Sequence, residues 1–241
     1  MGFRNTYADA AYAAAYAKLA FPGTYSLAFR DLPGILTEHV SRGRALDFGC
    51  GTGRSARFLS ECGFQVVGVD IADVMIREAR KLDPAGDYRL VKDGDFAPLG
   101  RGSFDLVLSA FTFDNVATMT NKAELLTGLR GLLAPGGRIV MLVSSPEMYT
   151  HEWVSFSTKA FPENRRARNG DTVRIINLAI ADSTPCEDVL WTDDAYQETF
   201  RRAGLALVKA YRPLAADSDP GEWVNETSIA PWVIYVLRAA A

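Results

Sequence analysis

The chain has 241 residues, of which 48% are apolar and 23% are charged, and its formal net charge at pH 7 is −3. This length fits one globular domain with a substantial core. The acidic balance gives no basic footprint for a nucleic-acid-binding face, and no apolar run reaches the roughly 18 residues that span a bilayer.

The N-terminal region predicts two helices before the first strand. Residues 6–20 are rich in alanine, a strong helix former, and a Pro-Gly pair follows them. Tyr12 and Tyr16, four residues apart, share a face of this helix and can pack on a core with their hydroxyls at its rim. The alternative is that the segment caps a ligand pocket, and Tyr25 is a further aromatic candidate for such a contact. A second helix is expected around Leu27–Val40.

A glycine-rich turn follows the first predicted strand. A short apolar run ends in Asp47, and glycines then alternate at Gly49, Gly51 and Gly53 before the helix Arg54–Cys62. Glycine allows a left-handed backbone and lets a ligand approach without a Cβ in the way. The helix that follows offers unpaired N–H groups at its first turn. The segment therefore predicts a cradle for a ligand.

A dinucleotide is one ligand that such a turn could hold. Its fingerprint is G-x-G-x-x-G/A; counted from Gly49 the sixth residue is Arg54, and counted from Gly51 it is Ala56. The second frame fits formally, but the strand would then end in Gly49-Cys50 instead of in apolar residues. We therefore discount a nicotinamide dinucleotide.

An α/β alternation continues beyond the turn. The strand Phe64–Asp70 ends in an acid, and a helix is expected over Ile71–Arg80. Asp70 follows Gly53 by 17 residues, near the separation at which doubly wound folds place a ribose-binding carboxylate. The alternative is that Asp70 only caps the next helix.

Three further strands complete the regular part of the pattern. They are expected at Tyr88–Lys92, Gly102–Ala110 and Arg138–Val143, and the helix Glu124–Leu133 lies before the last of them. The second is almost continuously apolar, as a buried parallel strand should be. The turn Phe111–Val116 follows it and should face a ligand at the carboxyl ends of the strands.

Residues 144–192 interrupt the alternation. Thr172–Ile180 and Glu187–Trp191 are expected strands within otherwise loop-like sequence. The helix Thr192–Gly204 and two final strands, Leu205–Tyr211 and Pro231–Leu237, restore the pattern and close the sheet.

Residues 44–143 resemble the class I S-adenosylmethionine-dependent methyltransferases. The matching blocks come in the family's order: Leu-Asp47-Phe-Gly-Cys-Gly-Thr-Gly, Val-Asp70-Ile-Ala-Asp-Val-Met, Asp93-Gly-Asp-Phe, Phe104-Asp105 and Leu133-Ala-Pro-Gly-Gly. The resemblance implies an α/β fold with a doubly wound, seven-stranded, mostly parallel sheet. It also implies one domain, residues 1–241, with an N-terminal helical cap (1–43), a cofactor-binding core (44–143), a lid insertion after the fifth strand (144–192) and the end of the sheet (193–241).

The resemblance also implies roles for single residues. Asp47 would stand near the methionine end of S-adenosylmethionine and Asp70 would bind the ribose. Asp95 would accept from the adenine amine, with Asp93 as its rival, and Phe96 would cover the ring. The expected cofactor contacts are Asp47, Gly49, Cys50, Gly51, Gly53, Asp70, Ile71, Met75, Asp95, Phe96, Ser109, Ala110, Phe111 and Tyr25.

Methyl transfer from a sulfonium is an in-line displacement, which needs alignment and exclusion of water but no metal. His151 in the lid is the imidazole placed to remove a proton from a hydroxyl substrate, unless it is a surface loop histidine. Asp114 is a second candidate, and it could instead cap a helix. We expect Tyr16, Asn115 and Trp153 to contact the substrate. An amine substrate would need no base.

These observations predict a methyltransferase acting on an O or N atom of a small molecule. The turn Phe111–Val116 lacks the N-P-P-[YF] sequence of enzymes that modify nucleobases and protein amides, which argues against a macromolecular substrate. A non-catalytic scaffold or sensor that binds S-adenosylmethionine is the other alternative. We expect no nucleic-acid or membrane partner, a monomer or homodimer, and, from three cysteines without a C-x-x-C pair, a cytoplasmic protein with reduced thiols.

Overall fold

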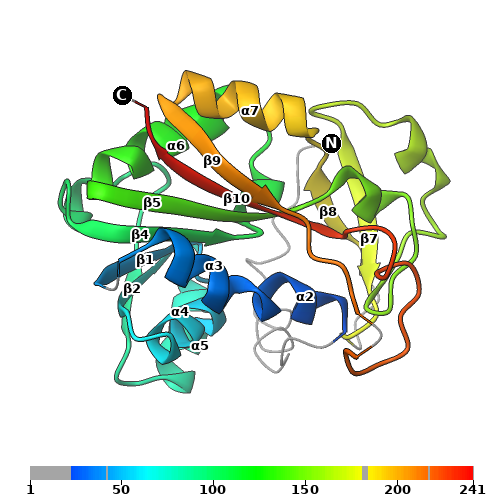
Figure 1. Cartoon of the computed structure of the whole chain (residues 1–241), viewed down its shortest axis with the longest axis horizontal. Coiled ribbons are helices and arrows are strands. Elements are labelled where there is room, and N and C mark those ends of the chain that lie inside the picture. Colours follow the sequence, from blue (N-terminus) through cyan, green and yellow to red (C-terminus); the bar gives the residue numbers. More distant parts are fainter. Residues whose placement is uncertain (1–22, 42, 181–183, 217, 241) are drawn as a thin grey trace.

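The computed structural model describes residues 23–41, 43–180, 184–216 and 218–240. A seven-stranded sheet with the order β3-β2-β1-β4-β5-β10-β9 crosses the molecule (Figure 1). β10 runs antiparallel to both of its neighbours, and the pairs from β3 to β5 are parallel. The strands are β1 (Arg44–Phe48), β2 (Gln65–Asp70), β3 (Asp87–Leu90), β4 (Phe104–Ala110), β5 (Leu133–Ser144), β9 (Leu205–Tyr211) and β10 (Trp232–Ala239). The predicted doubly wound, mostly parallel α/β sheet is confirmed.

Helices cover both faces of this sheet. In Figure 1, α3, α4 and α5 lie below the sheet and α6 and α7 lie above it. Their bounds are α3 (Leu32–His39), α4 (Arg54–Glu61), α5 (Asp73–Leu82), α6 (Met119–Leu132) and α7 (Asp193–Arg202). The central strand β4 shows why both faces are needed: Leu106 and Leu108 belong to one buried cluster and Val107 to the other. Because successive side chains of a strand alternate between faces, an apolar strand such as this requires two layers of helices.

The helix expected over Leu27–Val40 is instead two helices. α2 (Thr24–Arg30) ends at Asp31, and α3 begins at the next residue. Pro33 lies in the first turn of α3. Proline has no N–H to donate to the carbonyl four residues earlier, so it ends one helix but is tolerated at the start of the next. The helix predicted over residues 6–20 lies outside the described residues.

The insertion after β5 forms a small sheet of its own. Its strands, in the order β6-β7-β8, pair antiparallel, and β7 and β8 are the two strands expected from the sequence. Their bounds are β6 (Phe156–Ser157), β7 (Thr172–Asn177) and β8 (Cys186–Val189). Short 3-10 helices connect the elements: η2 (Ala97–Leu99), η3 (Thr112–Asn115), η4 (Pro146–Tyr149) and η5 (Pro162–Arg166).

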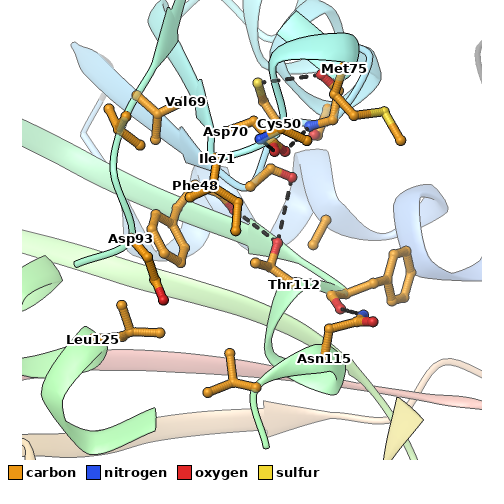
Figure 2. A pocket seen from close by; sticks show the side chains of 18 of the residues that line it. Phe48, Cys50, Val69, Asp70, Ile71, Met75, Asp93, Thr112, Asn115 and Leu125 are labelled. Carbon is orange, nitrogen blue, oxygen red and sulfur yellow. Dashed lines mark hydrogen bonds between the residues drawn. The ribbon is translucent and has the colours of Figure 1, made fainter. Parts of the chain in front are cut away.

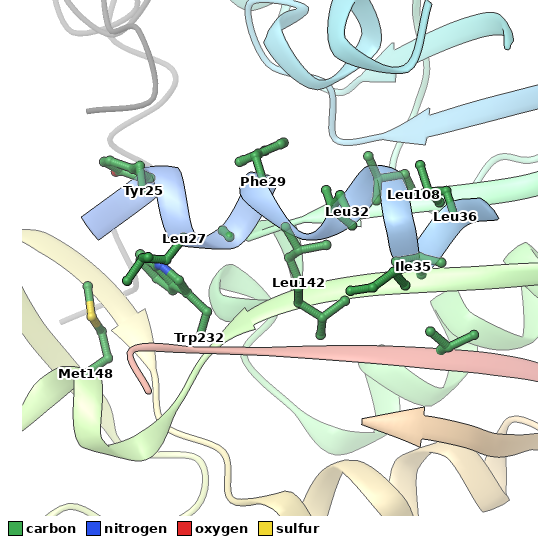
Figure 3. Close-up of a cluster of buried hydrophobic side chains, with 14 of the residues drawn as sticks. Tyr25, Leu27, Phe29, Leu32, Ile35, Leu36, Leu108, Leu142, Met148 and Trp232 are labelled. Carbon is green, nitrogen blue, oxygen red and sulfur yellow. The ribbon is translucent and has the colours of Figure 1, made fainter. Parts of the chain in front are cut away.

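Buried polar contacts anchor α2 to the insertion and to the loop before β10. The buried Glu226 carboxylate accepts from Thr24 Oγ1 at 2.7 Å and from the Val154 amide at 2.8 Å. The Trp232 indole donates to the Thr24 carbonyl at 2.8 Å. Figure 3 shows the apolar cluster around this helix, in which Trp232 packs beneath Leu27. These contacts place α2 over the carboxyl ends of the central strands.

Across the described part of the chain, none of the helices combines the length and the apolar character required to cross a membrane.

Candidate functional site

A cavity of about 760 Å³ opens at the carboxyl ends of β1, β2 and β4 (Figure 2). Its walls come from the glycine turn after β1, the end of β2, the turns after β3 and β4, one face of α6, and Phe29 of α2. In a parallel sheet these strand ends meet at one edge, which is where open α/β folds bind ligands. Among the described residues, no group of three or more His, Cys, Asp or Glu side chains is placed to hold a metal ion.

The three glycines of the turn serve different purposes. All have positive φ, at 74°, 51° and 80° for Gly49, Gly51 and Gly53. A Cβ on Gly49 would lie 2.1 Å from Thr112 Oγ1, and one on Gly53 would lie 2.7 Å from the Tyr88 ring. A Cβ on Gly51 would meet nothing within 4 Å, and Gly51 lines the cavity. Gly49 and Gly53 therefore make room for protein packing, and Gly51 leaves room for a ligand.

Asp70 stands at the end of β2 with its carboxylate already held by the backbone. Oδ2 accepts from the Gly51 amide at 2.9 Å and Oδ1 accepts from the Ala72 amide at 2.8 Å. Burial raises the pKa of this carboxyl above its ordinary value. Each oxygen keeps a second lone pair for a ligand hydroxyl, because a carboxylate offers about four acceptor positions. Asp70 thus fixes the glycine turn and can still hold a pair of hydroxyl groups.

Asp47 lies fully buried beneath the same turn. Its Oδ2 accepts from Ser55 Oγ at 2.6 Å, while Oδ1 has no hydrogen-bond partner among the described residues. Burial raises the pKa of this carboxyl to about 7. Asp47 does not line the cavity, but Ser55 does. A buried acid of this kind favours positive charge nearby, since that offsets the cost of ionising it.

The turn after β3 places Asp93, and not Asp95, in the wall of the cavity. The Asp95 carboxylate accepts instead from the amide of Ala97, the first residue of η2, at 3.2 Å. Phe96 lines the cavity, and its ring centroid lies 6.0 Å from that of Phe48. Figure 2 shows Asp93 on the side of the cavity that also carries Leu125. The predicted contacts Cys50, Ile71 and Met75 also line the cavity.

The turn after β4 brings Ala110, Phe111 and Asn115 to the cavity. Phe111 is the one described residue other than glycine with positive φ, at 63°, a conformation that costs energy in an L-residue and that concentrates at functional sites. Thr112 Oγ1 donates to the Phe48 carbonyl at 3.1 Å and so ties this turn to β1. Ser109 is fully buried behind the wall and does not line the cavity.

Behind this turn lies a buried charge cluster that the sequence did not indicate. Asp114 accepts from the Ser144 amide at 3.0 Å and from Ser144 Oγ at 2.9 Å. The fully buried Lys122 ammonium donates to the Phe113 carbonyl, and Asp188 of β8 accepts from the Tyr149 hydroxyl at 3.1 Å.

Burial raises the pKa of both carboxyls in this cluster and lowers that of the Lys122 ammonium. Asp114 does not line the cavity. It holds the turn after β4 against the end of β5, close to the strand of the insertion that carries Asp188.

Three further predicted residues that the structure describes lie away from the cavity. His151 Nδ1 lies 3.1 Å from Thr150 Oγ1 and 3.2 Å from the Glu147 carbonyl. The Trp153 indole donates to the Met148 carbonyl, and Tyr25 packs between Phe156 and Trp232 with its hydroxyl accepting from Asn177. Neither His151, Trp153 nor Tyr25 lines the cavity. Tyr16 lies outside the described residues.

Several wall residues were not predicted. Among them are Phe29, Phe48 and Thr112, together with Asn121, Leu125 and Gly128 on one face of α6. Gly128 carried a signal that could have been noticed, because glycine in the middle of a predicted helix is disfavoured and needs a reason.

The chain is similar in sequence and in fold to known proteins. A family model described as a methyltransferase domain matches residues 46–141. The N-demethylindolmycin N-methyltransferase of Streptomyces griseus is 28% identical over 205 residues, which cover 83% of this chain and 85% of that protein. The 18S rRNA (guanine-N(7))-methyltransferase of Bos taurus is 33% identical over 104 residues, 40% of this chain and 37% of that protein. The structure of the CcbJ methyltransferase from Streptomyces caelestis superposes with a TM-score of 0.68 at 19% identity and 98% coverage of both chains.

The matched segment holds every residue that lines the cavity except Phe29 of α2. The open space at Gly51, the free lone pairs of Asp70 and the unpaired oxygen of Asp47 fit a nucleoside that carries a cationic amino-acid end. S-adenosylmethionine is the methyl donor of the family. The chain belongs to the class I S-adenosylmethionine-dependent methyltransferases.

Proposed function

We propose that the protein transfers a methyl group to an oxygen or nitrogen atom of a small molecule, with nitrogen favoured. The observation that carries this proposal is the extent of the similarity to the N-demethylindolmycin N-methyltransferase, which covers 83% of the chain. The rRNA-modifying relative matches 40% of the chain. Similarity that extends over most of the chain supports a small molecule, because the cofactor core alone says little about the acceptor.

S-adenosylmethionine supplies an electrophilic methyl group on a sulfonium. We assign the ribose hydroxyls to Asp70, the adenine amine to Asp93 and the adenine face to Phe96, all of which line the cavity. Asp47 lies behind the turn, where its carboxylate would balance the positive charge of the methionine end. Phe29 and Phe111 give the cavity an apolar wall near the glycine turn, which would help to exclude water from the displacement.

A nitrogen acceptor agrees with the chemistry of the wall. A neutral amine attacks with its own lone pair, whereas a hydroxyl needs a base within hydrogen-bond reach. Among the described residues, no histidine lines the cavity, and of its wall carboxylates Asp70 and Asp93 are assigned to the cofactor, which leaves Glu124 of α6 as the base for a hydroxyl acceptor. His151 Nδ1 lies within hydrogen-bond distance of Thr150 Oγ1 and the Glu147 carbonyl. We accordingly withdraw His151 and Asp114 from the reacting groups and keep Asn115, which lines the cavity, as a candidate substrate contact.

Calorimetry and a methylation screen together test the proposal. The protein is titrated with S-adenosylmethionine, S-adenosylhomocysteine and NAD, and then incubated with methyl-labelled S-adenosylmethionine and a panel of small amines, phenols, total RNA and protein extract. We expect binding of the first two ligands and labelling of an amine.

The other outcomes separate the alternatives. Binding without transfer to any acceptor would favour a scaffold or sensor. Labelling confined to RNA or protein would assign a macromolecular substrate. Binding of NAD alone would contradict the cofactor assignment itself.

A further inference from the structure

Gly128 lies in the interior of α6, on the face that this helix turns toward the cavity. Asn121, Leu125 and Gly128 are spaced by four and three residues, which puts them on one side of a helix, and all three line the cavity. Glycine destabilises a helix interior relative to alanine, since it loses more backbone freedom on folding. Its presence here therefore calls for a packing or binding reason.

The ring of Phe96 supplies that reason. A Cβ on Gly128 would lie 2.2 Å from Phe96 Cε2 and 2.3 Å from Cδ2. These distances are far shorter than a carbon–carbon contact, so the ring can occupy its place only against bare backbone. Phe96 comes from the turn after β3, and its ring centroid lies 6.0 Å from that of Phe48 of β1. The absence of a side chain at Gly128 thus makes room for the Phe96 ring, which comes from a distant segment of the chain.

The second glycine of the same helix behaves differently. The nearest atom to a Cβ on Gly131 would be Arg101 Nη2, at 3.8 Å, which is an ordinary contact. Neither glycine has positive φ. Alanine at Gly131 would therefore meet no obstacle, whereas alanine at Gly128 would displace an aromatic ring.

The cavity has a further apolar side chain near the end of β2. Ile71 lines the cavity with 53% of its surface exposed, so its apolar surface is available to a ligand there. The carboxylate of Asp93 belongs to the same cavity wall as Phe96. Apolar faces with a hydrogen-bond acceptor beside them suit a flat heteroaromatic ring that carries an amino group.

We propose that Gly128 is a positioning residue for the methyl donor: its missing side chain lets Phe96 lie against α6 and form a wall of the adenine slot. The inference rests on the proposed function in one respect, the assignment of Phe96 to the adenine ring. Gly128 acts through Phe96 and not by contact with the ligand.

The test compares Gly128→Ala with Gly131→Ala, a matched control in the same helix. Calorimetric titration uses S-adenosylhomocysteine and, separately, adenosine. For Gly128→Ala we expect the Kd of both ligands to rise about tenfold or more, the range for loss of one base–aromatic contact. Equal effects on both ligands would place the loss at the nucleoside, because adenosine lacks the amino-acid end. For Gly131→Ala we expect unchanged affinity.

A double-mutant cycle with Phe96→Ala shows whether the two residues act together. If Gly128 acts by making room for the Phe96 ring, adding Gly128→Ala to Phe96→Ala removes nothing more, because no ring remains to displace. The Kd should then change by no more than about twofold, and the unfolding midpoint by no more than ~2 °C. This pair also carries the test if Gly128→Ala alone does not fold.

Three outcomes would overturn the inference: wild-type affinity in Gly128→Ala, an equal loss in Gly131→Ala, or a full second loss on the Phe96→Ala background. Failure of the wild-type protein to bind S-adenosylhomocysteine would instead refute the assignment of the cofactor site on which the inference rests.

Discussion

Thr112 Oγ1 donates a hydrogen bond to the main-chain carbonyl of Phe48 at 3.1 Å. The bond joins the turn after β4 to the last residue of β1, immediately before the glycine turn. Gly49 makes the contact possible, because a Cβ there would collide with the Thr112 hydroxyl. The turn that holds Phe111 at positive φ is therefore fixed by the same strand end that carries the cofactor cradle.

Thr112→Val should destabilise the protein by about 1 kcal/mol, because valine keeps the shape but leaves the Phe48 carbonyl without this donor. Urea denaturation measures the change. Thr127→Val is the matched control: its hydroxyl donates to the Ala123 carbonyl on an exposed face of α6, and its loss should stay within ~0.5 kcal/mol. Equal losses in the two variants would show that the hydrogen bond to Phe48 contributes no more to stability than the exposed hydrogen bond of Thr127.

Alanine substitutions at Gly51 and Gly49 should distinguish an effect on ligand binding from an effect on stability. Gly51→Ala meets only open space, so its cost in stability should be limited to the left-handed backbone, roughly 1–2 kcal/mol. Its methyl group would nevertheless enter the ligand space and abolish binding of S-adenosylhomocysteine. Gly49→Ala adds a collision with Thr112 to the same backbone cost and should lower the free energy of unfolding further. Thermal unfolding and calorimetry distinguish them, and a Gly51→Ala protein that binds normally would place the ligand elsewhere.

Asp70→Asn should weaken S-adenosylmethionine binding by roughly 1.5–3 kcal/mol, the usual worth of hydrogen bonds to a charged acceptor. Part of the loss will come from the glycine turn, because Asp70 also accepts from the Gly51 amide. Asp73→Asn, in the first turn of α5, removes an exposed carboxylate that pairs with Arg77 and should leave the affinity within about 0.5 kcal/mol. Calorimetric affinity that is unchanged in Asp70→Asn would remove this residue from the ribose.

The pH dependence of stability should report the buried Asp47. Its pKa is about 7 in the folded protein, whereas an unfolded aspartate has a pKa of about 3.9. Between these values the folded state binds the extra proton, so this group makes the free energy of unfolding fall as pH rises, by at most ~1.4 kcal/mol per pH unit.

Asp47→Asn removes this proton site, and urea denaturation between pH 4 and 7 should give a shallower decline than in the wild type. Asp73→Asn serves again as the control for loss of an exposed carboxylate. Parallel wild-type and Asp47→Asn curves would mean that Asp47 is ionised in the folded protein throughout this range.

The sheet and the cofactor cradle follow from local sequence. The strand–turn–helix pattern around Gly49–Gly53 and the acid at Asp70 are encoded within short segments, and parallel topology brings their strand ends to one edge. That is why the seven-stranded sheet agrees with the sequence prediction. The same topology places Gly51, Asp70, Ile71 and Met75 in the wall of one cavity. The break between α2 and α3 is also encoded in the local sequence, because Pro33 prevents one continuous helix there.

The rest of the site depends on contacts between segments far apart in the chain. The irregular turn after β3 offers Asp93 and Asp95 two residues apart, and only its folded path directs the first to the cavity and the second to the Ala97 amide. His151 and Trp153 were expected at the site from their place in the insertion, yet local hydrogen bonds hold both elsewhere.

Lys122 and Gly128 looked like ordinary helix positions. Their surroundings, a buried charge cluster and an aromatic ring, come from other elements of the fold. Periodicity and spacing determine which elements form and where their ends meet, because those depend on neighbouring residues. Tertiary packing decides which residues each side chain contacts, because a buried contact forms only when two segments far apart in the chain are brought together.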